Sequence, residues 1–290
     1  MSQPTAHHHR RSVGFAAAAL LAIAGCTTAA PTATPRSAVP SPSATQVASA
    51  TATVAPTPSA APTSSPEPTP AFPRNPAPII EGAQYTQVID PAAFVTGVDN
   101  PFLPLAVGTR WIFEGDEHVE VEVLSGTKVI LGVNATVVSD RVFQDGKLIE
   151  DTLDWYAQDV DGNVWYFGED TKEFGADGAV STTGSWEGGV AGAQPGIVMK
   201  AHPKPGGGSY RQEYRRGEAE DQAEVVGVDK RVSVRFGSFT GVVVTKEFTA
   251  LEPGLLEHKY YARDVGLVRE TTVHGGSDRS ELVELRRPSA

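Results

Sequence analysis

The chain of 290 residues contains one cysteine, Cys26, so no disulfide can form within it. Proline is scarce after residue 80, because 14 of the 22 prolines lie before that point. The remainder, residues 81–290, is long enough to bury a sizeable core without a cross-link or a metal. We therefore expect one folded domain there.

Basic residues are also scarce in that domain. Residues 81–290 hold 20 Lys and Arg against 34 Asp and Glu, a net charge of −14. A surface of this balance repels phosphate backbones and anionic lipid headgroups. Nucleic acid is therefore excluded as an expected partner.

Recognisable catalytic motifs are missing. The chain has no Gly-x-Ser-x-Gly, no His-Glu-x-x-His and no phosphate-binding glycine loop with a lysine. The histidines after residue 80 do not have metal-ligand spacing and are expected on polar strand faces; they are His118, His202, His258 and His274. The sequence therefore predicts no catalytic residue and no cofactor.

Long apolar runs are limited to residues 13–23, which are too few to span a bilayer. Arg10 and Arg11 precede this run, and the combination is typical of a secretory signal peptide over residues 1–25. General secretion is favoured over twin-arginine export, because the Phe-Leu pair expected after the arginines is missing.

The signal ends in Ile23-Ala24-Gly25-Cys26, which resembles the lipobox of bacterial lipoproteins. The resemblance implies that Cys26 receives diacylglycerol, becomes the first residue of the mature protein and anchors it to the membrane on the extracytoplasmic face. The alternative for Cys26 is an ordinary buried thiol.

Residues 27–78 are almost entirely Ala, Thr, Ser and Pro, which predicts a disordered linker over residues 26–80. A proline-rich chain rises about 3.1 Å per residue, so the linker could hold the domain up to roughly 150 Å from the membrane. Either a bare linker or an O-glycosylated stalk fits this composition.

The rest of the chain has the pattern of an all-β domain. Val119, Val121 and Val123 alternate with polar residues, as in a half-buried antiparallel strand. Residues 153–158 and 163–167 are aromatic-rich strands, and Asp161-Gly162 between them predicts a tight turn with positive φ angles. Asp145-Gly146 predicts another such turn. Further strands are expected at residues 117–124, 135–143, 147–152, 239–248, 255–262, 266–273 and 280–286.

About a dozen strands and no long helix predict a curved antiparallel meander sheet or an open (half) barrel over residues 81–290. Residues 99–115, with the run Gly-Thr-Arg-Trp, resemble the start of extracytoplasmic domains in uncharacterised bacterial lipoproteins. Residues 237–269 are similar to the closing strands of the half-barrels of lipoprotein carriers. These resemblances imply a fold and a location, and no activity.

The aromatic residues supply the first candidate site. Because neighbours on a strand point to opposite faces, at least one large aromatic of the hairpin must lie outside the main core. We therefore predict a ligand face at Trp155, Trp165 and Trp186. In the alternative, a second layer covers that face, for example residues 184–196, which are rich in glycine and could equally form a lid.

Acidic residues supply two more candidates. Asp159, Asp161 and Asp170 partly match a calcium loop, although Asp-Gly-Asn is also what a plain hairpin turn requires. A second set could supply the paired carboxylates of a glycoside hydrolase or form a solvated strand face; it comprises Glu213, Glu218, Glu220, Asp221 and Glu224. The sequence thus favours an anchored binding or envelope-structural module. The alternative is a carboxylate-dependent hydrolase of cell-wall or extracellular glycans.

Overall fold

The computed structural model of the protein describes residues 85–288. The predictions made for residues 1–84, which include the signal peptide, the lipidation of Cys26 and the linker, lie outside the described residues. Within residues 85–288, no helix has the length and apolar character required to cross a membrane.

The described residues are almost entirely β structure, which confirms the predicted fold class. A short 3-10 helix, η1 (Pro91–Ala93), precedes the strands. The strands are β1 (Phe94–Val95), β2 (Arg110–Gly115), β3 (His118–Ile130), β4 (Val133–Gln144), β5 (Lys147–Asp159), β6 (Val164–Phe174), β7 (Val180–Ser181), β8 (Trp186–Glu187), β9 (Gln194–Met199), β10 (Tyr210–Arg211), β11 (Glu213–Tyr214), β12 (Asp221–Val234), β13 (Gly237–Thr249), β14 (Leu256–Ala262), β15 (Gly266–His274) and β16 (Arg279–Arg286). Their number exceeds the predicted dozen because five of them are two-residue pairings.

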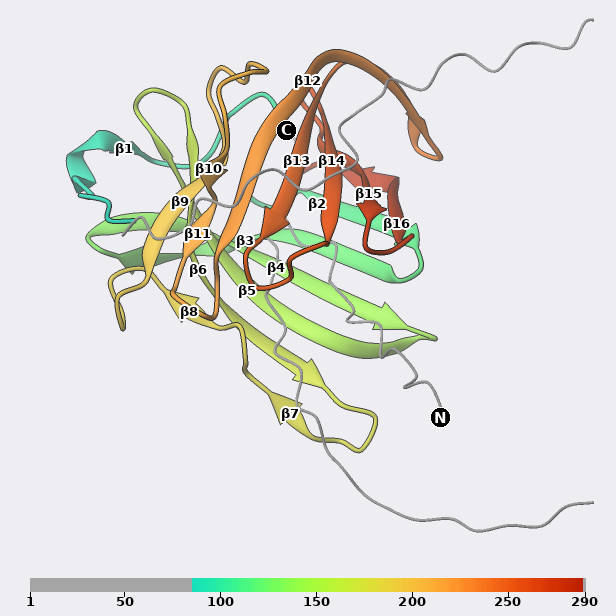
Figure 1. Cartoon of the computed structure of the whole chain (residues 1–290), viewed down its shortest axis with the longest axis horizontal. Coiled ribbons are helices and arrows are strands. Elements are labelled where there is room, and N and C mark those ends of the chain that lie inside the picture. The colour runs from blue at the N-terminus through green and yellow to red at the C-terminus, as the bar shows by residue number, and fades with distance from the viewer. Residues whose placement is uncertain (1–84, 289–290) are drawn as a thin grey trace, which may run out of the picture. The chain divides into compact units, whose positions relative to one another are not determined.

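The strands form one antiparallel meander, in the order β10-β12-β13-β14-β15-β16-β2-β3-β4-β5-β6-β9-β11. The last strand, β16, lies beside β2, with Leu282 opposite Phe113, and this pairing joins the two halves of the meander (Figure 1). The short strands β1, β7 and β8 pair with β5 or β6 outside this path.

Residues 210–214 bring the two ends of the sheet together. Their first half, β10, pairs with β12, and their second half, β11, pairs with β9. Gln212, between the two halves, donates its backbone N–H to the carbonyl oxygen of Asp221 at 2.9 Å. The sheet is therefore curled into a nearly closed barrel, which leaves little unpaired edge.

The hairpin turns partly match the predictions. Asp145 and Gly146 have φ angles of +51° and +75°, as a tight turn requires. In the tryptophan hairpin the turn lies at residues 160–162, as predicted, but only Gly162 has a positive φ, +93°, so the positive φ predicted for Asp161 was wrong. The strand predicted to end at residue 124 continues to Ile130.

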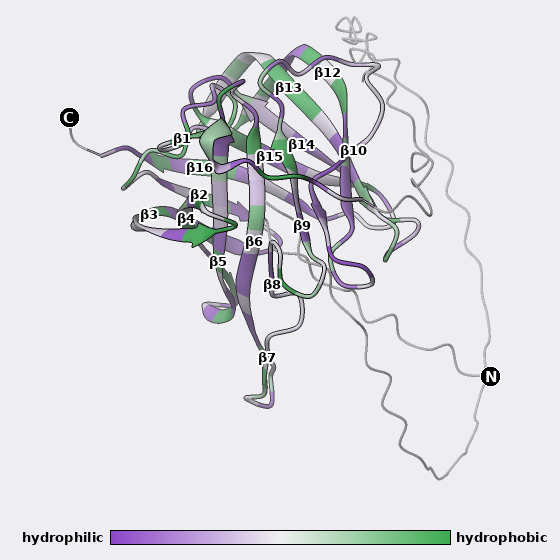
Figure 2. Ribbon diagram, turned by 90° about the vertical axis from the view of Figure 1, so that its left-hand side faces the viewer, coloured by the Kyte–Doolittle hydropathy of each residue, from purple (hydrophilic) through white to green (hydrophobic). Residues whose placement is uncertain are grey.

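The main core fills the inside of the curled sheet. Trp111, Phe113, Val119 and Val121 have at most 1% of their surface exposed. The indole of Trp111 donates to the backbone oxygen of Val265 at 2.7 Å, which connects β2 to the turn before β15. Hydrophilic stretches on β5 and β6 contrast with hydrophobic stretches on β12 and β13 (Figure 2).

A second, smaller core lies on the other face of β4, β5 and β6. Its buried members are Ile130, Val133, Ala135, Trp155, Ala157 and Phe167. Ile89 and Phe94, from the segment before and within β1, pack against it. The outer face of the tryptophan hairpin is therefore covered by the chain around residues 89–94. Residues 184–196 instead contribute β8, which pairs with β6, and the start of β9.

Candidate functional site

Carboxyl groups line the inner face of β4, β5 and β6. Strand pairing places them on three successive cross-strand rows, Val142–Glu150–Glu173, Asp140–Thr152–Thr171 and Val138–Asp154–Glu169. Val138 and Val142 belong to the main core, so this face points into the barrel. We call the five acidic residues of these rows the acid ladder: Asp140, Glu150, Asp154, Glu169 and Glu173.

Hydroxyl groups connect the rows of the acid ladder. The Thr152 hydroxyl lies 3.0 Å from Glu150 Oε1 and 3.1 Å from the hydroxyl of Thr171. The Tyr166 hydroxyl lies 2.7 Å from Asp154 Oδ1 and 2.9 Å from Glu169 Oε2. A phenol has one proton to donate, so both contacts are satisfied when one of the two carboxyl groups is itself protonated.

Burial favours the protonated form of these acids. It raises the pKa of Asp154 to about 7; the charge of Glu150 adds to the rise, while the Tyr166 hydrogen bond and Lys259 act against it. Burial likewise raises the pKa of Asp140 and of Glu169 well above the usual range, and neighbouring carboxylates contribute in both cases. The carboxyl groups inside the barrel therefore bind protons more readily than exposed carboxyl groups do.

Lys259 brings a positive charge to the opposite wall. Its Nζ lies 3.1 Å from Glu247 Oε2 and 3.9 Å from Glu270 Oε2, which are its neighbours on β13 and β15. Burial lowers the pKa of Lys259, but the carboxylates, with Glu247 first, more than offset this and raise the pKa well above its usual value. Lys259 is therefore charged inside the barrel.

A pocket of about 690 Å³ lies at the end of the acid ladder. Glu150 and Glu173 belong to its wall. The other lining residues come from the β4–β5 and β6–β7 hairpins and from Glu117, and many are apolar: Val142, Gln144, Asp145, Lys147, Leu148, Ile149, Phe174, Gly175, Ala176, Ala179, Val180 and Ser181. Burial, and then the charge of Glu150, raises the pKa of Glu173 to about 7. The volume is in the range of small-molecule sites.

The three predicted tryptophans do not share one face. Trp186 points into the barrel, where its indole packs edge-on against Tyr166 and donates to Glu213 Oε2 at 3.0 Å. Trp165 lies on the outer face and donates to Asp159 Oδ2 at 2.8 Å. Trp155 is 5% exposed in the smaller core.

Trp155 and Trp186 nevertheless border a second pocket, of about 330 Å³. The ring of Trp155 is covered there, because Lys128 Nζ lies 3.4 Å from its centroid. Lys128 also forms an ion pair of 2.7 Å with Glu187. Lys128 therefore occupies the ring face of Trp155 in this pocket.

The three calcium candidates have different surroundings. Asp159 is occupied within the hairpin loop, where its carboxylate accepts hydrogen bonds from the backbone and side-chain amides of Asn163 and from the indole of Trp165. Asp161 is exposed at the loop tip, and Asp170 lies in β6 opposite Leu153. Within residues 85–288, no three His, Cys, Asp or Glu side chains converge on a metal position.

The second acidic set is divided between the interior and the surface. Glu213 and Asp221 are buried, and Glu213 raises the pKa of Glu169. Glu218 pairs with Arg215 at 2.6 Å, Glu224 pairs with Lys246 at 2.5 Å, and Glu220 lies 3.7 Å from Arg211. The structure thus brings Glu213 beside the acid ladder and disperses the others.

The acid ladder was not identified from the sequence. The available signal was the alternation of Glu150, Thr152, Asp154 and Tyr156 along one strand, which is polar every second residue. The opposite face of the same strand carries Leu153, Trp155 and Ala157 and gave the stronger core signal.

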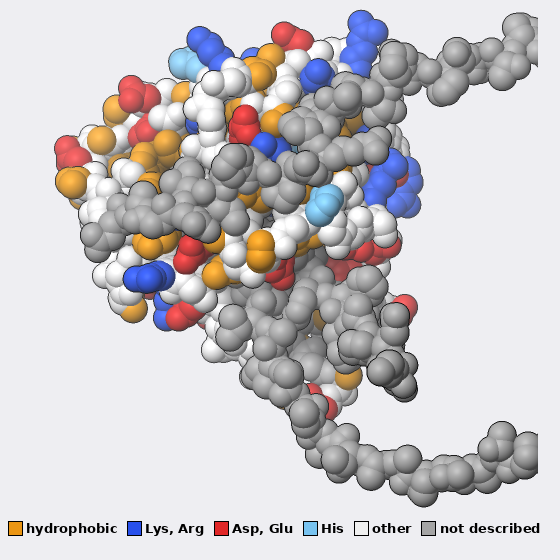
Figure 3. Space-filling model, viewed as in Figure 1, with side chains coloured by type: hydrophobic (Ala, Val, Ile, Leu, Met, Phe, Trp, Pro, Cys, Tyr) orange, Lys and Arg blue, Asp and Glu red, His pale blue; other side chains and the backbone are white. Residues whose placement is uncertain are grey.

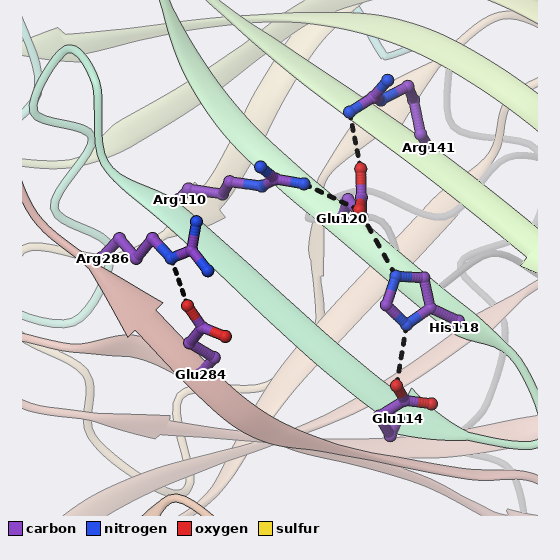
Figure 4. A network of polar contacts seen from close by, with 7 residues as sticks. All are labelled: Arg110, Glu114, His118, Glu120, Arg141, Glu284 and Arg286. Atoms are coloured by element: carbon purple, nitrogen blue, oxygen red, sulfur yellow. Dashed lines mark hydrogen bonds and ion pairs between the residues drawn. The ribbon is translucent and has the colours of Figure 1, made fainter.

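The outer face of the barrel near β2, β3 and β4 carries a separate polar network (Figure 4). Glu120 accepts contacts from Arg110 at 2.7 Å and Arg141 at 2.6 Å, while His118 lies 2.8 Å from Glu114. On β16, Arg286 pairs with Glu284. On the face seen in Figure 3, charges of both signs are interspersed with hydrophobic side chains. These contacts pair charges at the surface.

No protein-family model and no curated protein matches the chain. Similar solved structures include a "putative exported protein with YmcC-like fold" from Bacteroides fragilis, 16% identical with a TM-score of 0.39, over 64% of this chain and 99% of that chain. Another is a "putative lipoprotein" from Parabacteroides distasonis, 12% identical with a TM-score of 0.37 over the same shares. TM-scores of this size carry no conclusion about function.

Proposed function

We propose that the protein is a lipid-anchored extracytoplasmic binding module whose barrel takes up a small ligand. In this proposal residues 1–25 are a signal peptide, Cys26 carries the lipid, residues 26–80 are the linker, and residues 81–290 form the ligand-binding domain. The lipobox motif Ile23-Ala24-Gly25-Cys26 supports the anchor and the extracytoplasmic location.

The pocket of about 690 Å³ carries the binding part of the proposal. It combines apolar walls, such as Ile149 and Phe174, with a few convergent polar groups, and Glu173 in it has a pKa raised to about 7. This combination is typical of ligand sites. The pocket of about 330 Å³ is a weaker site because Lys128 covers the Trp155 ring.

A neutral apolar dye tests this proposal. N-phenyl-1-naphthylamine fluoresces in apolar surroundings and should bind the full chain, with Cys26→Ala so that no lipid competes, at one site per molecule. Ser181 lies opposite Glu173 in the strand pairing and lines the pocket. Ser181→Trp should therefore fill the pocket and weaken dye binding at least tenfold.

The matched control is Val129→Trp, which adds the same indole at an exposed position of β3 outside the lining of the pocket. It should leave dye binding unchanged. The proposal is wrong if the dye does not saturate one site, or if the two tryptophan variants bind it equally.

A further inference from the structure

We propose that the ligand of the 690 Å³ pocket is a small organic cation, a protonated amine on an apolar body, whose ammonium group lies between Glu150 and Glu173. This inference rests on the proposed binding function and names the class of ligand. It is independent of the tryptophan residues that the sequence singled out.

The charge of the pocket favours a cation. Four of its lining residues are acidic and one is basic; they are Glu117, Asp145, Glu150 and Glu173 against Lys147. The whole domain carries −14, so the field around the pocket mouth also attracts positive ligands and repels anions.

Glu150 and Glu173 lie directly opposite each other on β5 and β6. Side chains in such a pair have Cβ atoms about 5 Å apart, so both carboxylates can contact one ammonium group. Like charges this close repel each other, and a bound cation would relieve that repulsion.

Hydrogen-bond acceptors without donors indicate what the ligand must supply. Glu173 Oε1 is shielded from solvent and accepts no hydrogen bond from any residue of the described part of the chain. One row deeper, Asp140 is 1% exposed, and both of its carboxyl oxygens likewise lack a donor within residues 85–288. Buried acceptors are normally satisfied, and an ammonium group offers three N–H donors and no acceptor.

The apolar walls distinguish an organic cation from a bare ion. Val142, Leu148, Ile149, Phe174 and Val180 line the same pocket. A hard metal ion prefers six or more oxygen ligands, whereas this pocket offers a pair of facing carboxylates beside hydrocarbon. An alkyl or aryl amine matches both the facing carboxylates and the apolar walls of the pocket.

The release of protons on ligand binding is a measurement that a merely structural role of Glu173 would not affect. The pKa of Glu173 is raised to about 7, so near this pH part of the population is protonated before binding. Glu150 on β5 is the charged group that faces it most directly, while Glu117, Asp145 and Lys147 lie around the mouth and β7 contributes no titratable side chain. An ammonium group favours the ionised carboxylate, so binding should release protons near pH 7 and none at pH 9.

The experiment is displacement of the naphthylamine dye from the full Cys26→Ala chain at pH 7.5 by octylamine, octanol and octanoate, which share one chain length. We expect octylamine to displace the dye at a concentration at least tenfold lower than octanol, and octanoate to be the weakest. Glu150→Gln and Glu173→Gln should each reduce the preference for octylamine over octanol at least fivefold. Glu218→Gln, at an exposed residue outside the pocket lining, should change nothing.

The outcomes separate this inference from the function on which it rests. If the dye binds but octylamine and octanol displace it equally, or the two Gln variants keep the full preference, the cation inference is wrong while the binding module stands. If the dye does not bind at all, the binding function itself fails. Calorimetry of octylamine binding in two buffers of different ionisation heat measures the protons released, and equal release at pH 7 and pH 9 would also overturn the role given to Glu173.

Discussion

Replacing Asp154 by Asn should make the stability of the barrel less sensitive to a rise in pH from 5 to 7. Asp154 is 2% exposed, and its pKa is raised to about 7 inside the barrel. In the unfolded chain the same group ionises near its ordinary value, so between these two pH values the folded state holds a proton that the unfolded state has released. The contribution of Asp154 to stability is therefore fully present below its unfolded pKa and is lost as pH rises towards 7.

The size of the effect follows from the width of the pH range between the unfolded and the folded pKa of Asp154. From pH 5 to pH 7 the wild-type protein should lose about 1.4 kcal/mol per pH unit through this group, roughly 2 to 3 kcal/mol in all. The amide of the Asp154→Asn variant has no proton to lose, and its oxygen can still accept the Tyr166 hydrogen bond. The substitution should therefore change stability little at pH 5 and raise it by roughly 2 to 3 kcal/mol, relative to wild type, at pH 8.

The other titratable groups around Asp154 are present in both proteins, so their contributions cancel in this comparison to first order. Those that face or surround Asp154 are Asp140, Glu150, Glu169, Tyr166 and Lys259. His258, whose pKa burial lowers to about 4, produces the opposite trend between its folded and unfolded pKa values, and does so in both proteins. The assay is urea unfolding of wild type and variant at pH 5 and pH 8.

The control is Asp161→Asn, the same substitution at an exposed loop position. It should stay within about 0.5 kcal/mol of wild type at both pH values. A difference between wild type and Asp154→Asn that is the same at pH 5 and pH 8 would refute the view that the barrel interior holds protonated carboxyl groups.

Three further predictions concern the tryptophans, the anchor and the linker. Trp155→Ala should cost about 3–5 kcal/mol in urea unfolding, and Trp165→Ala less, because Trp155 is 5% exposed in the smaller core while Trp165 is half-buried; equal losses would contradict this. Cys26→Ala should move the protein out of the membrane fraction or block its processing, and a wild-type protein that takes up no lipid label would rule out the anchor. A chain that starts at Ala83 should unfold at the same temperature as one that starts at Thr27, and a stability loss above about 1 kcal/mol would show that the linker docks on the domain.

The local alternation of apolar and polar residues, together with the turn residues, was sufficient to predict much of the meander. Val119, Val121 and Val123 are buried as their alternation indicated, and β13 to β16 lie within one or two residues of the strands expected between residues 239 and 286. Period-two alternation and turn residues are properties of short segments, so a single sequence reveals them.

Two features could not be predicted because they depend on distant segments. On β5, Leu153 and Trp155 gave the stronger apolar face, yet Asp154 and Tyr156 point into the barrel, because residues 89–94 cover the other side. Closure of the barrel by residues 210–214 depends on pairing with both β9 and β12. Neither partner can be deduced from the hydropathy of the segment itself.

A nitroxide-labelled amine provides the most direct test of the central claim, that a small organic cation binds at the end of the acid ladder. With methyl groups of Ile, Leu and Val labelled for NMR, the spin label should broaden Leu148, Ile149 and Val180 in the 690 Å³ pocket, and excess octylamine should reverse the broadening. Val190, which borders the smaller pocket near Trp155, serves as the internal reference. Broadening confined to Val190, or none that octylamine reverses, would contradict the account.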